Sequence, residues 1–121
     1  MALVKIYRVE GRDGNGPYSG VTTNSHNLQK KLRKHNSQTG RPSPHADGIQ
    51  RCSEYPMREY YFGFTHVDKL KEWFKGSRTA LRQDGYKMAV YEVDVSDVLF
   101  GKKQAAFVKK LANPIKTVKI P

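Results

Sequence analysis

The sequence predicts an α+β fold: a single domain with a mixed or mostly antiparallel sheet and helices packed on one side of it. Three observations support this prediction. Short segments rich in β-branched and aromatic residues recur from the start of the chain to its end. Helical spacing of apolar residues is confined to a few short stretches between them. The resulting order, β-α-loop-β-α-α-β-β-β, favours an α+β domain over a regular βαβ repeat.

The first part of the chain predicts one strand, one surface helix and two loops. The β-branched content of Leu3–Val9 predicts a strand. The glycine-rich segment Gly11–Gly20 predicts a loop. Ser25 is a suitable cap for a short helix that runs to about His35. Residues 36–56 contain prolines and glycines without periodicity, so we expect a long loop there, and long loops are often functional.

The middle of the chain predicts a buried strand followed by a helix. Tyr60–Phe64 is a short aromatic run that predicts the strand. Thr65 and Asp68 have the spacing of a capping-box variant, with Thr65 at the cap and Asp68 in the first turn. The apolar residues that follow share one helix face and are expected to pack on the sheet: Val67, Leu70 and Phe74, with Trp73 beside them.

The last part of the chain predicts a second short helix and three strands. Ser77 is expected to start the helix and Gly85 to end it. Tyr86–Val95 is the clearest strand pattern and is expected to be central, with Met88, Val90 and Tyr91 against the helix that begins after Thr65. Two further strands are expected at Gln104–Val108 and Ile115–Ile120, joined by a turn at Asn113–Pro114.

Composition limits the class of protein and of partner. At 121 residues, one domain spanning 1–121 is the expectation. The chain has 22 Lys and Arg against 11 Asp and Glu, and the net charge of +11 favours anionic partners such as nucleic acid, a nucleotide or an acidic protein. The single cysteine excludes a disulfide framework within one chain. No apolar run approaches the roughly 20 residues of a membrane span, so we expect no membrane partner and a cytoplasmic setting.

Several polar residues are candidates for a binding site. Arg8 lies near the end of an apolar strand, where it either points to solvent or binds a phosphate or carboxylate with its planar fork. Gly14, Gly16 and Tyr18 follow, and the two glycines form either a simple turn, which is the more common case, or a turn whose amides line a phosphate. Tyr61 is either a core aromatic or a ring that stacks on a flat ligand.

Two further places in the sequence leave alternatives open. His45 and Asp47 are two residues apart and form either an acid–base pair or, as we favour, part of a turn. Because no other ligands can be placed beside them, we predict no metal site. Gln104 is either a solvent-facing strand residue or an amide that hydrogen-bonds a ligand.

These pieces resemble, in their order, the Arg-Ser-Glu class of ADP-ribosyltransferases. Tyr7-Arg8 is similar to that class's first-strand arginine, Phe64-Thr65 to its second motif, and Gln104 falls where it usually has a catalytic glutamate. The resemblance implies an ADP-ribosyltransferase-like fold, NAD as the cofactor, and Arg8 and Gln104 as the catalytic residues. It implies that Arg8 holds a phosphate of NAD, that the segment including Tyr61 and Thr65 contacts the nicotinamide side, and that Gln104 binds ribose without the charge of glutamate.

The chain also resembles short proteins of tailed bacteriophages and their hosts. The shared features are an early Gly-Pro-Tyr, His and Pro in the middle, and Trp-Phe after a Gly-Phe strand. Together, the two resemblances lead to the hypothesis of a phage-encoded domain that binds NAD or a related nucleotide and acts on a host component. Two alternatives remain: a basic nucleic-acid-binding module using residues 29–35 and Lys102, Lys103, Lys109 and Lys110, and a non-catalytic inhibitor of an acidic host protein.

Overall fold

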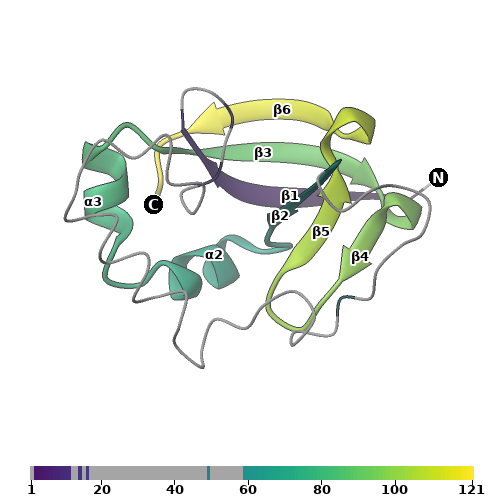
Figure 1. Cartoon of the computed structure of the whole chain (residues 1–121), viewed down its shortest axis with the longest axis horizontal. Helices are drawn as coiled ribbons and strands as arrows, with labels where there is room; N and C mark the ends of the chain where they lie inside the picture. Colours follow the sequence, from purple (N-terminus) through teal and green to yellow (C-terminus); the bar gives the residue numbers. More distant parts are fainter. Residues whose placement is uncertain (1, 12–13, 15, 17–48, 50–58) are drawn as a thin grey trace.

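The computed structural model describes residues 2–11, 14, 16, 49 and 59–121, and in them it contains two antiparallel three-stranded sheets and two short α-helices (Figure 1). The described elements form one small, mostly β domain. Some of the sequence-based expectations lie outside the described residues: the helix from Ser25 to His35, most of the loop 36–56, Tyr18, and the pair His45 and Asp47.

The first sheet has the strand order β1-β3-β6 and the second has the order β2-β5-β4. The strands of the first sheet are β1 (Leu3–Glu10), β3 (Lys87–Asp94) and β6 (Asn113–Val118). Those of the second are β2 (Tyr60–Gly63), β4 (Val98–Phe100) and β5 (Ala105–Val108). The central position of β3 is confirmed, as is antiparallel pairing, but the single predicted sheet is wrong because the short strands pair separately.

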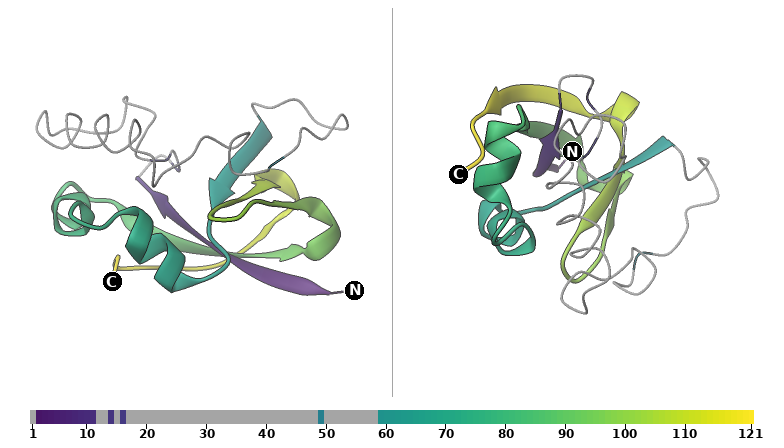
Figure 2. Two further views of the ribbon diagram at one scale, coloured as in Figure 1. Left: turned by 90° about the horizontal axis from the view of Figure 1, so that it is seen from below. Right: turned by 60° about the vertical axis from the view of Figure 1, so that its left-hand side comes forward.

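Two α-helices and two 3₁₀ turns complete the described fold. The helices are α2 (Val67–Trp73) and α3 (Arg78–Gln83), and the turns are η3 (Val95–Asp97) and η4 (Lys109–Leu111). Figure 2 shows the helices toward one end of the long strands and the second sheet toward the other. Within the described part of the chain, no helix is long and apolar enough to cross a membrane.

The side-chain alternation of β3 separates the core into two layers. Met88 and Val90 lie on the face that α2 and α3 cover, in one cluster with Leu70, Trp73 and Phe74. Ala89, Tyr91 and Val93 lie on the opposite face, packed with residues of the second sheet. The predicted helix-on-sheet core is therefore confirmed except for Tyr91. Because side chains alternate along a strand, Tyr91 points to the face opposite that of Met88 and Val90, away from the helices.

The central strand of the second sheet, β5, is buried on both faces. Ala105 and Phe107 of β5 pack against the first sheet, whereas Ala106 and Val108 pack with Ile49 on the outer face. This explains why β5 is buried at all four positions and contains only apolar residues.

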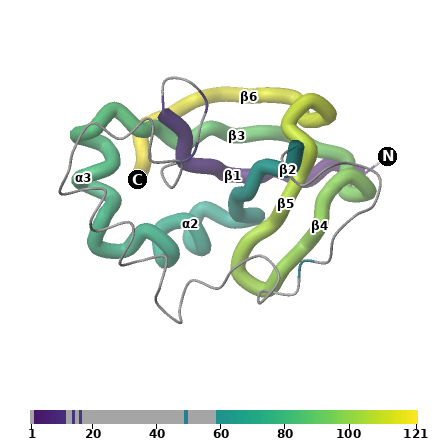
Figure 3. The backbone as a smooth tube through the Cα atoms, viewed as in Figure 1, coloured from purple at the N-terminus to yellow at the C-terminus, as the bar shows by residue number. Residues whose placement is uncertain are grey.

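The two sheets are joined where the chain leaving β2 crosses β1. The backbone amides and carbonyls of Tyr7 and Phe64 form two hydrogen bonds, of 2.7 and 2.8 Å. Figure 3 shows the chain passing from β2 across β1 toward α2. Gly63 lies at the crossing, and a Cβ atom there would lie 2.6 Å from Cγ2 of Ile6 and 2.8 Å from the Tyr7 carbonyl oxygen. The close approach of two backbones therefore requires glycine at this position.

Replacing Gly63 with alanine is expected to destabilise the protein by about 1–3 kcal/mol, because the added methyl must push two backbones apart in a packed core. Urea unfolding followed by circular dichroism measures this loss. Gly76→Ala is the matched control for overpacking, because a Cβ at Gly76 meets nothing within 4 Å. This control variant is destabilised only by the backbone strain of an alanine at a positive φ. A Gly63 variant as stable as the wild type would contradict the crossing geometry.

The sequence predicts both ends of α3 correctly but predicts the wrong cap for α2. α3 has Ser77 as its N-cap residue and ends with Gly85 at φ 91°, as predicted. The amides of Gly85 and Tyr86 donate to the carbonyls of Arg82 and Leu81, which is a Schellman motif. At α2, however, the cap residue is His66 and no side chain caps it, so the capping box at Thr65 is wrong.

Two other predictions differ from the structure near the C-terminus. Asn113–Pro114, predicted as a turn, are the first residues of β6. Proline is tolerated there because β6 is an edge strand, with a bulge opposite Val90 and Tyr91. β4 was not predicted, because a three-residue strand is too short to show a period.

Candidate functional site

The candidate site begins with the two charged residues at the end of β1. Arg8 and Glu10 are two residues apart in a strand, so their side chains leave the same face, the face that Ile6 presents to the second sheet. Both side chains are largely buried, with 11% and 12% of their surface exposed. Charged groups at that depth need partners. These two pair with each other, and further contacts come from β3, from the second sheet and from η4.

The Arg8 guanidinium is held on three sides. Its Nε donates to Oε2 of Glu10 at 3.0 Å, and its Nη1 donates to the carbonyl oxygen of Phe62 at 2.9 Å. The guanidinium carbon also lies 4.5 Å from the centre of the Tyr61 ring, within the range of a cation–π contact. Its Nη2 faces Gly16, where a Cβ would lie 3.4 Å away. Arg8 therefore connects β1, β2 and the glycine-rich segment.

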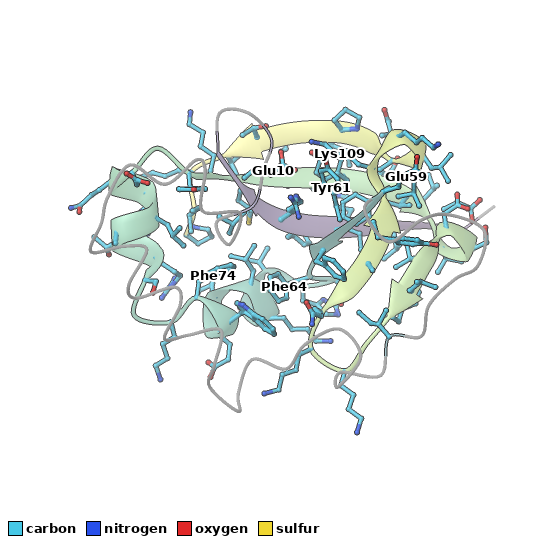
Figure 4. All side chains as sticks on the ribbon, in the orientation of Figure 1. Glu10, Glu59, Tyr61, Phe64, Phe74 and Lys109 are labelled. Carbon is cyan, nitrogen blue, oxygen red and sulfur yellow. The ribbon has the colours of Figure 1, made fainter. Side chains whose placement is uncertain are left out.

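Glu10 accepts from more than one donor on a single oxygen. Besides Arg8, the hydroxyl of Tyr91 donates to Oε2 at 2.6 Å, and Nζ of Lys109 lies 3.8 Å from the same atom. Figure 4 shows Glu10, Tyr61 and Lys109 gathered on the same side of the first sheet. We call Arg8, Glu10, Tyr61, Tyr91 and Lys109 the basic–tyrosine cluster. Two cations and one carboxylate leave it with one net positive charge.

Lys109 reaches the cluster because η4 turns the chain directly after β5. Its ammonium lies 4.9 Å from the centre of the Tyr61 ring and 5.9 Å from that of Tyr91. A Cβ on Gly14, which has φ 80°, would lie 2.8 Å from this ammonium. A third of the Lys109 side chain is exposed, so it is the cation of the cluster with the most access to solvent.

Burial shifts the protonation of two groups in the cluster. Desolvation lowers the pKa of Arg8, and the charge of Glu10 and its hydrogen bond oppose that shift. Desolvation also raises the pKa of Tyr91 strongly, and the hydrogen bond to Glu10 and the charge of that carboxylate raise it further. The phenol of Tyr91 is therefore a stable hydrogen-bond donor to Glu10 at neutral pH.

Because the pKa of Tyr91 is raised on folding, its contribution to stability is complete below the pKa of an unfolded tyrosine, about 10. It is lost as the pH rises through the higher pKa of the folded state. The free energy of unfolding of the wild type should therefore fall above pH 10 more steeply than that of Tyr91→Phe. The difference should approach about 1.4 kcal/mol per pH unit. Urea unfolding from pH 8 to 11.5 measures it, and parallel curves for the two proteins would contradict this role of Tyr91.

The structure brings together some of the residues predicted for the site. Arg8, Gly16 and Tyr61 lie within one set of contacts. Thr65 lies farther along the chain, between the Phe64 bridge and α2. Gln104 is buried at the β4–β5 turn, at the other end of β5 from Lys109 and roughly 16 Å from it along the strand. The contacts that build the cluster involve Lys109 rather than Gln104, and a cleft shared by Arg8 and Gln104 stays a prediction.

Three members of the cluster were not predicted for the nucleotide site: Glu10, Tyr91 and Lys109, of which Lys109 was named only for the nucleic-acid-binding alternative. Glu10 could have been found from its two-residue spacing to Arg8, which places both on one face of a strand. Tyr91 and Lys109 could not, since their approach depends on how the second sheet packs on the first. In the described ranges, no group of three or more His, Cys, Asp or Glu residues is placed to hold a metal ion.

Comparison with known proteins gives a family for this chain. A family-wide sequence model described as bacteriophage T4 Y00F protein matches residues 1–121. The chain belongs to this family. Membership in the Y00F family supports the phage origin that the second resemblance implies. No curated protein and no solved structure is similar enough to the Y00F-family chain to count as a match.

Proposed function

We propose that this Y00F-family domain binds the phosphate-bearing part of a nucleotide, with NAD as the expected ligand, at the basic–tyrosine cluster. The proposal rests mainly on one observation: the Arg8 guanidinium and the Lys109 ammonium lie 4.5 and 4.9 Å from the centre of the same Tyr61 ring. The backbone and Glu10 fix the guanidinium, and a fixed planar fork is well suited to phosphate.

The glycines beside the two cations support an anion site. Gly14 lies against the Lys109 ammonium and Gly16 against Nη2 of Arg8. A side chain at Gly14 would meet the ammonium at 2.8 Å and would strain the positive φ, so glycine keeps the backbone close to the charge. A phosphate beside Lys109 and Nη2 would meet two positive groups and a backbone with no side chain to exclude it.

The finer form of the proposal is an ADP-ribosyltransferase-like domain that acts on a host component. Transfer of ADP-ribose breaks the bond between nicotinamide and ribose, and positive charge develops on the ribose in the transition state. The amide of Gln104 is neutral, and the Glu10 carboxylate already neutralises part of the charge of Arg8 and Lys109. The cluster therefore favours binding over transfer, and we propose nucleotide binding as the primary activity.

Titration calorimetry with NAD, ADP-ribose and inorganic phosphate tests the proposal. Replacing Lys109 with glutamine should weaken NAD binding about 10- to 100-fold, because a hydrogen bond to a charged group is removed. Lys119→Gln removes the same charge from an exposed position and should leave binding unchanged. No heat of binding from the wild type at millimolar NAD, or equal weakening by both variants, would overturn the proposal.

A further inference from the structure

The hairpin between β4 and β5 presents an exposed aromatic ring beside two lysines. The amide of Gly101 donates to the carbonyl of Gln104 at 2.8 Å and closes a four-residue turn, 101–104. Phe100, the last residue of β4, is 48% exposed. Lys102 and Lys103 at the tip of the turn are also exposed.

The exposure of Phe100 is unusual for its strand. Val98, two residues earlier on the same face of β4, is 7% exposed and packs in the core between the sheets. Phe100 is paired with Ala105, whose small buried side chain leaves about half of Phe100 exposed. A single exposed apolar residue is common on protein surfaces. An aromatic ring at the tip of a turn with two adjacent lysines is a more specific combination.

From the start of β4 onward, the charged residues of the sequence are all positive. Residues 98–121 contain six lysines and no aspartate or glutamate. This part of the chain therefore contributes more than half of the net charge of +11. The hairpin itself contributes two positive charges and no negative one, and this composition favours an anionic partner.

We propose that the tip of the β4–β5 hairpin binds single-stranded nucleic acid, with an unpaired base stacked on Phe100 and neighbouring phosphates on Lys102 and Lys103. Each nucleotide supplies both a flat π-face and a negative charge, which match the two kinds of group at the tip. An acidic peptide would use the lysines but has no need of the ring. A duplex keeps its bases stacked on one another, so the ring favours a single strand.

This binding surface is separate from the proposed nucleotide site. The hairpin turn precedes β5 and the cluster residue Lys109 follows it, so the strand separates the two. The inference does not depend on NAD binding, and each proposal can fail without the other.

Fluorescence anisotropy with a labelled 15-nucleotide single-stranded DNA of mixed sequence tests the proposal. Phe100→Ala should weaken binding about 5- to 100-fold, the effect of losing one stacked base, and Phe100→Trp should restore it. In a plot of log affinity against log salt concentration the slope is negative. Lys102→Gln/Lys103→Gln should make it shallower by about 0.7 for each phosphate that these lysines neutralise in the wild type. Lys69→Gln/Lys75→Gln is the matched control, because these lysines are exposed on and beside α2.

Circular dichroism of each variant establishes that it is folded, and a 15-base-pair duplex is titrated in parallel. The proposal requires wild-type binding to the single strand that depends on Phe100 and on the hairpin lysines more than on Lys69 and Lys75. Equal weakening by the two lysine double variants, or unchanged binding in Phe100→Ala, would show that binding is non-specific electrostatic attraction. Either result would overturn the proposal. Preference for the duplex, or no binding at 50 mM salt, would overturn it as well.

Discussion

Replacing Glu10 with alanine is expected to lower the free energy of unfolding by about 3 kcal/mol, because it leaves the charge of Arg8 buried without its carboxylate. The same change removes the acceptor of the Tyr91 hydroxyl and the anion beside Lys109. Both Arg8 and Glu10 are about nine-tenths buried, so water cannot fully replace the missing partner. Urea unfolding at pH 7 measures the effect.

Glu59 provides the control for Glu10. It pairs with Lys110 at 3.4 Å, but both side chains are more exposed, and exposed ion pairs contribute about 0–1 kcal/mol. Glu59→Ala should therefore cost less than about 1 kcal/mol. The double variant Arg8→Met/Glu10→Ala should recover part of the stability, because it removes both charges together. A Glu10 variant no less stable than Glu59→Ala would show that the cluster is not a buried ion pair.

The second large effect is expected at Leu70 of α2, which is fully buried between the helices and the first sheet. Leu70→Ala should destabilise the protein by about 2–5 kcal/mol through reduced burial and the cavity left behind. Phe64 and Phe74, labelled in Figure 4, pack in the same cluster, with their ring centres 6.2 Å apart. Lys69→Ala, at an exposed neighbour, should change stability by less than about 0.5 kcal/mol. An equally small effect of Leu70→Ala would show that α2 does not pack in the core.

Much of the fold could be predicted from local sequence patterns. The strand pattern of Leu3–Val9 and the long apolar strand that includes Met88 and Val90 depend on side-chain period, which a sequence displays directly. Gly85 at the end of α3 was found for the same reason: the need for a positive φ is a local property. Such features do not require knowledge of distant contacts.

The features that were missed depend on distant contacts or on very short elements. Tyr91 was assigned to the helix side because a fully buried strand does not show which face each residue occupies. Proline is usually a turn residue. Pro114 can lie in β6 only because β6 is an edge strand, where a missing backbone N–H is tolerated. The separation into two sheets follows from the crossing at Gly63, which is a close approach of two backbones and has no sequence pattern of its own.

The candidate site was found only in part, for a similar reason. Arg8, Gly16 and Tyr61 were singled out as residue types suited to phosphate and to stacking, and the structure brings them together. Lys109 reaches them only because the second sheet folds back on the first and η4 turns the chain after β5. A lysine in a basic chain has no local signal that distinguishes it from the others.

Titration of ¹⁵N-labelled protein with NAD, followed by NMR, tests the nucleotide site most directly. Binding at the basic–tyrosine cluster should shift the amide signals of Tyr61, Lys109 and Gly16 in a saturable way, and the shifts should be reduced in Lys109→Gln but not in Lys119→Gln. ADP-ribose should shift the same signals, because it retains both phosphates of NAD. Shifts confined to other parts of the chain, or none at millimolar NAD, would contradict the assignment of this cluster as a nucleotide site.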